Sequence, residues 1–124
     1  MKPWLFAASL NGFLAVAAGA FAAHGLSHRL PADALSWFET GARYHAYHAL
    51  ALLAIALLAA SGKAGTGWPL TLAGGGFLAG IILFSGSLYA MALTGERALA
   101  FITPIGGICF LAGWAGLLIL ALRS

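Results

Sequence analysis

Four long apolar runs constrain this chain more than any other feature. The most informative run covers residues 74–93, GGGFLAGIILFSGSLYAMAL, which opens on three glycines and carries Ser85, Ser87 and Tyr89 towards its end. At about 1.5 Å per helical residue, a run of this length spans the roughly 30 Å hydrocarbon core of a bilayer. Together with the apolar residues before and after it, the pattern predicts membrane spans at about 4–23, 44–60, 68–93 and 101–122.

Composition points to the same class of protein. Of the 124 residues, 62% are hydrophobic and 7% are charged, whereas charged residues make up about 25% of an ordinary soluble domain. A small soluble fold leaves too much surface exposed to hide so much apolar area. We therefore predict an integral membrane protein that forms one domain, 1–124. The formal charge of +3 is too small and too scattered to indicate nucleic-acid binding.

The first apolar run also resembles a secretory signal peptide, because Lys2 precedes it and the small residues on either side of Phe21 resemble a cleavage site. The apolar core of a signal peptide, however, is usually about 7–15 residues long. The run 4–23 is longer than that. We therefore expect it to be a retained first span.

The only substantial polar region, 24–43, separates the first two spans. Pro31 suits the start of a helix, and the residues after it divide into an apolar face and a polar face: Ala34, Leu35, Phe38 and Ala42 against Asp33, Ser36, Glu39 and Arg43. This pattern predicts a short amphipathic helix at the membrane interface. Gly41 would mark its junction with the second span, unless the two run on as one helix. The predicted fold is thus an all-α bundle of four transmembrane helices with a short interfacial helix between the first two.

Four spans place both termini on the same side of the membrane. Lysine and arginine residues are divided equally between the two sides: Lys2, Lys63 and Arg123 against Arg29, Arg43 and Arg97. All three acidic residues, Asp33, Glu39 and Glu96, lie on the side away from the termini. We expect a multi-pass protein of the inner (plasma) membrane with cytoplasmic termini.

Folding the spans into an antiparallel bundle brings most of the polar side chains into one leaflet. These candidate pocket residues are His24, Tyr44, His45, His48, Ser85, Ser87, Tyr89 and Thr103. Polar groups are costly in lipid and normally face the bundle interior or a water-filled cavity. The sequence therefore predicts a polar pocket near one membrane face.

Three interpretations of this pocket remain open. His45 and His48 share a helical face and imidazole suits zinc or copper, but neither a cysteine nor a carboxylate has a suitable spacing, so we predict no metal and no cofactor. Histidines and hydroxyls could instead line a path for a proton or small solute. In the third interpretation they anchor helix ends. We expect no catalysis, because no acid is placed to orient a histidine beside Ser85 or Ser87.

Small residues recur at helical spacing and predict close helix contacts. The packing glycines we expect are Gly12, Gly19, Gly76, Gly80, Gly106 and Gly113. The helix faces formed by these small residues are more extensive than the packing of one chain requires, so we expect a homo-oligomer in contact with lipid.

Asn11 and Trp114 lie inside spans. We expect each to bond to another helix, Trp114 through a serine, a threonine or a backbone carbonyl.

Several motifs carry a family resemblance: GAFAAHGL at 19–26, Tyr44 followed by HAYHA at 45–49, FSGSLY at 84–89, TPIGG at 103–107 and GW at 113–114. In order and spacing they resemble the YgdD/YwdK-type family of small bacterial membrane proteins, a domain of unknown function with an animal transmembrane counterpart. The resemblance implies a four-span inner-membrane protein and no established activity. The family pattern has glutamine in place of His45, so the resemblance implies no metal site at the histidine pair.

Two functions follow as expectations. The first is a non-enzymatic membrane protein whose polar pocket binds or passes a small solute, a proton or a lipid headgroup. The second is a structural or accessory protein that acts by helix packing with itself or with a partner.

Overall fold

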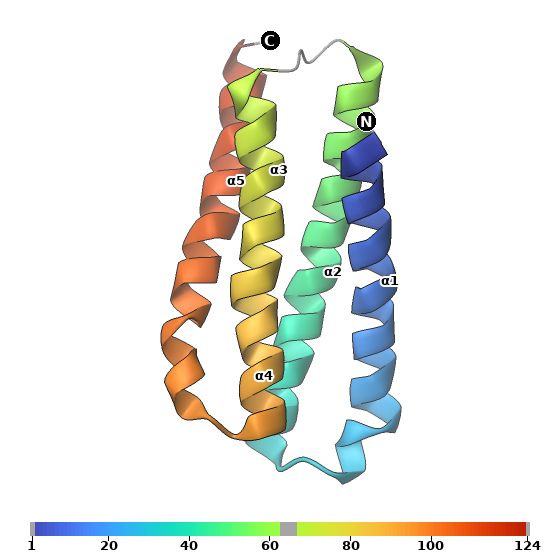
Figure 1. Cartoon of the computed structure of the whole chain (residues 1–124), viewed down its shortest axis with the longest axis vertical. Helices are drawn as coiled ribbons and strands as arrows, with labels where there is room; N and C mark the ends of the chain where they lie inside the picture. The colour runs from blue at the N-terminus through green and yellow to red at the C-terminus, as the bar shows by residue number, and fades with distance from the viewer. Residues whose placement is uncertain (1, 63–66, 124) are drawn as a thin grey trace.

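Helices account for nearly all of the residues that the structure describes. The computed structural model describes residues 2–62 and 67–123. Helix α1 (Lys2–His24) runs antiparallel to α2 (Ala32–Ser61), and the third span is built from α3 (Trp68–Gly80), η2 (Ile81–Ser85) and α4 (Gly86–Thr94). A short 3-10 helix, η3 (Arg97–Phe101), leads into α5 (Thr103–Arg123). The start of α1 and the end of α5 lie at the same end of the molecule (Figure 1).

Four of these helical segments are long and apolar enough to cross a membrane. They cover Lys2–His28, Ala32–Ser61, Trp68–Thr94 and Arg97–Arg123. The predicted all-α fold and the number of candidate spans are therefore confirmed. The short loop predicted at 61–67 lies largely outside the described residues.

The separate interfacial helix is a wrong prediction. Only a 3-10 turn, η1 (Leu26–His28), precedes Ala32, and α2 then continues without a break through the amphipathic segment and the second span. Gly41 lies inside α2 and does not end a helix. A Cβ atom on Gly41 would lie 3.0 Å from the Tyr89 ring and 3.3 Å from Leu88. The absence of a side chain at this position allows the close approach to α4.

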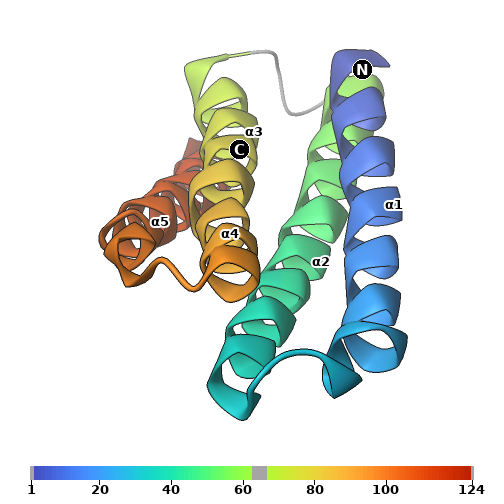
Figure 2. The same ribbon diagram turned by 60° about the horizontal axis from the view of Figure 1, so that its bottom comes forward.

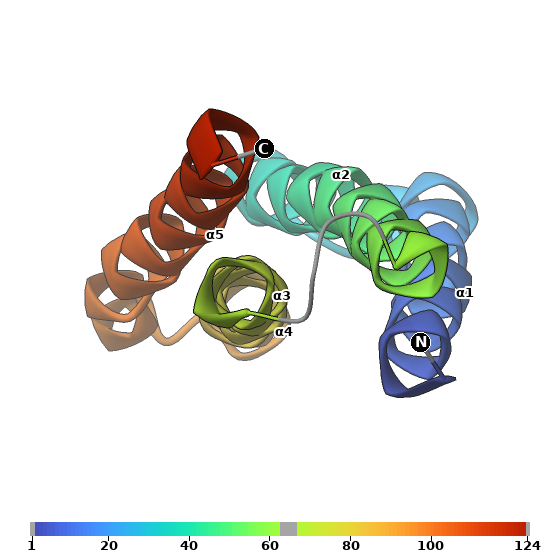
Figure 3. The ribbon, with the colours of Figure 1, turned by 90° about the horizontal axis from the view of Figure 1, so that it is seen from above.

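The helices form two antiparallel pairs. Helix α1 packs mainly on α2, and α3 packs mainly on α5, while α2 joins the pairs through its contacts with α3, η2 and α4. Seen from above, α1 and α5 lie at opposite ends of the arrangement (Figure 3). The α1–α2 and α4–α5 connections lie at the same end of the molecule (Figure 2).

Glycine contacts hold α5 close to the third span. A Cβ atom on Gly76 would lie 2.7 Å from the Gly113 nitrogen, and one on Gly106 would overlap the Phe84 backbone. The expected packing residues Gly80 and Gly113 are covered by the rings of Phe110 and Phe77. By contrast, Cβ atoms on Gly12 and Gly19 would meet nothing within 4 Å in the described chain. Direct packing of glycines on a neighbouring helix therefore occurs between α5 and the third span, whereas Gly12 and Gly19 are half-buried and border open grooves between α1 and α2.

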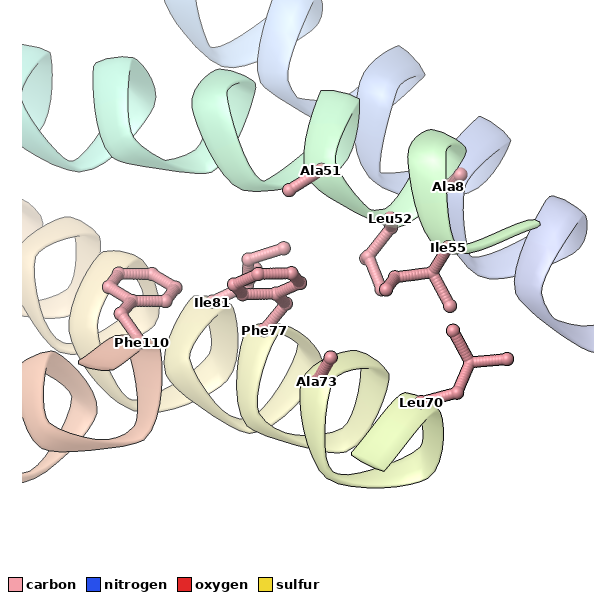
Figure 4. Packing of buried hydrophobic residues seen from close by; sticks show 9 residues of the cluster. All are labelled: Ala8, Ala51, Leu52, Ile55, Leu70, Ala73, Phe77, Ile81 and Phe110. Carbon is pink, nitrogen blue, oxygen red and sulfur yellow. The ribbon is translucent and has the colours of Figure 1, made fainter. Parts of the chain in front are cut away.

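The main apolar cluster lies where α2, α3 and α5 meet. Leu52, Ile55 and Phe77 have no exposed surface, and Phe110 extends the cluster from α5. The rings of Phe77 and Phe110 both lie in the space between the helices (Figure 4). Fully burying a side chain of this size in a packed site is typically worth a few kcal/mol in water; in lipid its contribution comes from close packing instead.

A π-helical turn interrupts the third span. Over Ile81–Ser85 the backbone widens, and the Gly86 N–H donates to the Ile81 carbonyl five residues earlier. Such turns insert one extra residue into a helix and often occur at functional sites. Here the turn lies directly before Ser87 and Tyr89, two of the residues predicted to line the pocket.

Candidate functional site

A hydrogen-bonded chain of three side chains links α1, α2 and α4. The His45 Nε2 atom lies 2.9 Å from Asn11 Oδ1, and His45 Nδ1 lies 2.9 Å from the Tyr89 hydroxyl. His45 and Asn11 are buried. The expected bond between Asn11 and another helix is confirmed, and its partner is His45. We call these three residues the His45 chain.

The partners of the His45 chain determine where its protons lie. The Asn11 amide nitrogen donates to the Ala7 carbonyl at 2.8 Å, which leaves its oxygen as the acceptor. Neutral His45 must therefore donate from Nε2 and accept the Tyr89 hydroxyl proton at Nδ1. Since a tyrosine hydroxyl can also accept, the same geometry would suit a doubly protonated His45.

His48 lies in a second polar contact, between α2 and α5. Its Nδ1 atom lies 2.8 Å from the Tyr44 carbonyl, and the Trp114 indole N–H donates to its Nε2 at 3.1 Å. A carbonyl only accepts and an indole only donates, so both His48 nitrogens are assigned: Nδ1 carries the proton and the ring is neutral. The expectation of an oxygen acceptor for Trp114 is wrong, because the acceptor of its indole N–H is the Nε2 nitrogen of His48.

Two serines make the remaining contacts. Ser85, which is fully buried, donates to the Gly41 carbonyl at 2.7 Å. Ser87 donates to the Phe84 carbonyl at 2.9 Å and lies 2.6 Å from the Thr103 hydroxyl. Because the Ser87 proton is engaged, Thr103 must donate to it. Within residues 2–62 and 67–123, every buried side-chain nitrogen or oxygen has a hydrogen-bond partner.

The predicted pocket residues are thus only partly brought together. His45 with Tyr89, and Ser87 with Thr103, are direct pairs. Ser85 instead bonds to a backbone carbonyl, and His48 bonds to a backbone carbonyl and to Trp114, which is not one of the predicted pocket residues. His24 is exposed at the end of α1. Because α2 begins at Ala32, His45 and His48 lie near the middle of a 30-residue helix. In the described part of the chain, no three His, Cys, Asp or Glu side chains are placed to hold a metal ion.

Sequence reasoning left the partners of two side chains open and missed one group altogether. Asn11 and Trp114 were identified as polar groups that need partners, but nothing in the sequence says that the partners are the histidines. The Gly41 carbonyl has no sequence signal, because any residue has a carbonyl and only the close approach of Ser85 in η2 gives this one a partner.

One groove exposes an edge of the His45 chain. It has a volume of about 620 Å³ and opens between α1 and the π-turn and α4. Its lining is mostly apolar, with the His45 chain at its floor: Asn11, Leu14, Ala17, Ala18, Phe21, His45, Ile81, Ile82, Gly86 and Tyr89. We call it the α1–α4 groove. Leu14, Phe21 and Ile82 are largely exposed, so the groove opens on the surface that faces lipid in a membrane.

The two buried histidines should hold opposite neutral tautomers. We expect nitrogen-15 NMR of histidine-labelled protein in lipid to show a proton on Nδ1 of His48 and on Nε2 of His45. The Trp114→Phe variant removes the indole donor and should change only the His48 signals. A shared tautomer for the two rings, or a charged His48, would contradict the hydrogen-bond assignment.

The fold and these contacts define a small multi-pass α-helical membrane protein whose polar side chains are paired between helices. Residues 18–107 match the family described as "Protein of unknown function (DUF423)". This match covers well over half of the chain, and the chain belongs to that family.

Curated relatives cover nearly the full length of the chain. It is 48% identical over 114 residues to a UPF0382 membrane protein of Haemophilus influenzae, which covers 92% of this chain and 89% of the relative. It is 42% identical to the UPF0382 membrane protein YwdK of Bacillus subtilis, over 99% of this chain and 98% of the relative. It is 46% identical to the UPF0382 inner membrane protein YgdD of Escherichia coli K12, over 96% of this chain and 88% of the relative.

These findings confirm the family resemblance and the membrane class. The name of the E. coli relative agrees with the expected inner-membrane location. No solved structure matches the chain. The orientation of the termini stays a prediction.

Proposed function

We propose that this protein is a non-enzymatic membrane protein that binds a lipid-type amphiphile from the side, in the α1–α4 groove. The observation that carries the proposal is a groove of about 620 Å³ that is open to the lipid-facing surface and has the His45 chain at its floor. This volume lies within the range of known ligand sites, about 300–1,000 Å³.

The lining of the α1–α4 groove suits an aliphatic chain. Leu14, Ile81 and Ile82 supply branched apolar walls, and Ala17, Ala18 and Gly86 leave space between them. A single acyl or isoprenoid chain can lie along such a surface. Contacts with the groove replace the contacts that the acyl or isoprenoid chain makes with neighbouring lipids in the bilayer. The affinity of the amphiphile for the groove must therefore come from shape complementarity and from its polar group.

Tyr89 is the group that would contact the polar part of the amphiphile. Its hydroxyl bonds to His45 and the residue is only partly buried, so a lone pair on the oxygen stays available to a ligand hydroxyl or amide. His45 is buried behind it and would set the direction of the tyrosine proton.

Lateral binding fits this geometry better than passage across the membrane. A path along the helices needs polar groups at successive depths, with a route to water at each end. The described contacts instead run between neighbouring helices, and His24 at the end of α1 is exposed rather than joined to them.

Filling the α1–α4 groove tests the proposal. A Cβ atom on Gly86 would meet only the Ile81 carbonyl, at 3.9 Å, and Gly86 lines the groove, so Gly86→Leu should fold and place its side chain in the groove. Gly75→Leu is the matched control, because no described atom lies within 4 Å of its Cβ position and it is not part of the groove. In native mass spectra of protein extracted in mild detergent, we expect retained lipid on the parent protein and on Gly75→Leu, and loss of it from Gly86→Leu. Equal lipid on all three would overturn the proposal.

The helix-packing function is a second proposal, supported by the open grooves beside the α1 glycines. Gly12 and Gly19 are half-buried and line grooves between α1 and α2 that the described part of the chain does not fill. The same mass spectra count the chains in each particle. Dimers that persist in Gly86→Leu but are lost in Gly12→Leu would favour a packing role for α1.

A further inference from the structure

A second groove, between α2 and α5, is lined by aromatic side chains. It has a volume of about 450 Å³ and is lined by Tyr44, Tyr47, His48, Phe84, Gly107, Phe110, Leu111 and Trp114. We call it the aromatic groove. It shares no lining residue with the α1–α4 groove, so it is a separate place for a ligand.

The rings of the aromatic groove form a connected wall. The His48 ring stacks on Phe110 with centroids 3.6 Å apart and planes within 8°. The Tyr44 ring lies 4.8 Å from Phe84 and is nearly parallel to Phe110. Flat rings prefer offset-stacked or edge-to-face neighbours, so a wall of this kind favours a flat, conjugated ligand over a flexible chain.

The free polar groups in this wall are two tyrosine hydroxyls. Both nitrogens of His48 are engaged, with the Tyr44 carbonyl and Trp114. Neither the Tyr44 nor the Tyr47 hydroxyl has a hydrogen-bond partner among the described residues. In a lipid environment an unpaired hydroxyl is costly. The groove therefore presents two donors that a ligand with oxygen acceptors would satisfy.

Access to the aromatic groove is from the lipid-facing surface. Tyr47 is 53% exposed, Trp114 is 48% exposed and Leu111 is 69% exposed. At the α5 wall, Gly107 leaves space: a Cβ atom there would meet only the Phe84 ring, at 4.0 Å. A ligand dissolved in the bilayer could thus reach the wall without a helix movement.

From these observations we propose that the aromatic groove binds a flat, membrane-soluble ring that carries carbonyl oxygens, the chemistry of a quinone headgroup. The ring stacks against Tyr44 and the His48–Phe110 pair. The Tyr44 and Tyr47 hydroxyls donate to the carbonyl oxygens. No redox step is part of this proposal.

Duroquinone and durene form a matched pair of probes for this site. They share a flat ring with the same four methyl groups, but durene lacks both carbonyl oxygens. The methyl groups of duroquinone also leave no open ring position for reaction with the single cysteine of the chain, Cys109 in α5. Binding of radiolabelled duroquinone is measured on the protein in lipid nanodiscs, with the signal of empty nanodiscs subtracted. We expect a saturable component that unlabelled duroquinone displaces at about tenfold lower concentration than durene does, the difference that two hydrogen bonds supply.

Three variants locate the site. Gly107→Leu fills the groove and should abolish saturable binding, whereas Gly75→Leu should retain it. The double variant Tyr44→Phe, Tyr47→Phe keeps the rings and should weaken duroquinone binding about tenfold while leaving durene unchanged. A folded Gly107→Leu protein that still binds, or equal displacement by the two probes, would overturn the proposal. Gly86→Leu leaves the aromatic groove intact, so failure of the lipid proposal is distinguishable from failure of this one.

Discussion

Gly106→Ala is expected to destabilise the protein by about 3 kcal/mol, at the upper end of the usual cost of overpacking. The added methyl group would overlap the Phe84 nitrogen and lie 2.7 Å from the Leu83 carbonyl carbon. Both are backbone atoms, which cannot move aside as a flexible side chain can. Helix α5 would have to shift away from the π-turn, and the Ser87–Thr103 contact would lengthen with it.

The neighbouring glycine supplies the control. A Cβ atom on Gly107 meets only the Phe84 ring, at 4.0 Å, and alanine is favoured over glycine in a helix by up to about 1 kcal/mol. Gly107→Ala should therefore be neutral or stabilising. Reversible unfolding in mixed micelles measures both free energies. Equal stability of the two variants would mean that α5 does not lie as close to the third span as described.

His45→Leu is expected to have the second large effect, a loss of about 1–3 kcal/mol in the free energy of unfolding, measured in the same mixed micelles. It removes two bonds and leaves the buried Asn11 oxygen and the partly buried Tyr89 hydroxyl without their partner. Hydrogen bonds between helices in a membrane average about 0.6 kcal/mol, with a maximum near 1.7. Unsatisfied buried groups add to the loss.

A glutamine substitution at the same position separates the polar effect from the loss of packing. The glutamine amide could donate to the Asn11 oxygen and accept from the Tyr89 hydroxyl, so His45→Gln should retain most of the stability that His45→Leu loses. Because the three side chains of the His45 chain are hydrogen-bonded to one another, Tyr89→Phe should lower the free energy of unfolding much less in a His45→Leu background than in the parent protein. Additive losses would show that the His45 chain is not a coupled unit.

The helices were predictable because apolar runs of about twenty residues allow few alternatives in a membrane. The start of α2 was not, since Pro31, Gly41 and a charged face fit two short helices as well as one long helix. Whether the segment forms two short helices or one long helix depends on what Gly41 contacts. Its contact is Tyr89 on α4, which lies far away in the sequence.

The candidate site shows the same division. Residue types alone indicated that His45, His48, Asn11 and Trp114 would need partners. Which groups pair depends on how α2 is rotated between α1 and α5, and no local pattern fixes that rotation. Gly12 and Gly106 illustrate the point: both are glycines at helical spacing, but a Cβ atom on Gly12 would meet open space and one on Gly106 would meet the Phe84 backbone.

The π-turn at Ile81–Ser85 makes the third span behave as two helices out of phase. One extra residue corresponds to about 100° of rotation in a regular α-helix, so the helical wheel that describes 68–80 no longer describes 86–94. The same span can thereby direct glycines to α5 along its first part and Tyr89 to α2 along its last part. A single-residue deletion within the turn would bring the two wheels into phase and turn one of these faces away from its partner helix, so the two sets of contacts require the extra residue of the turn.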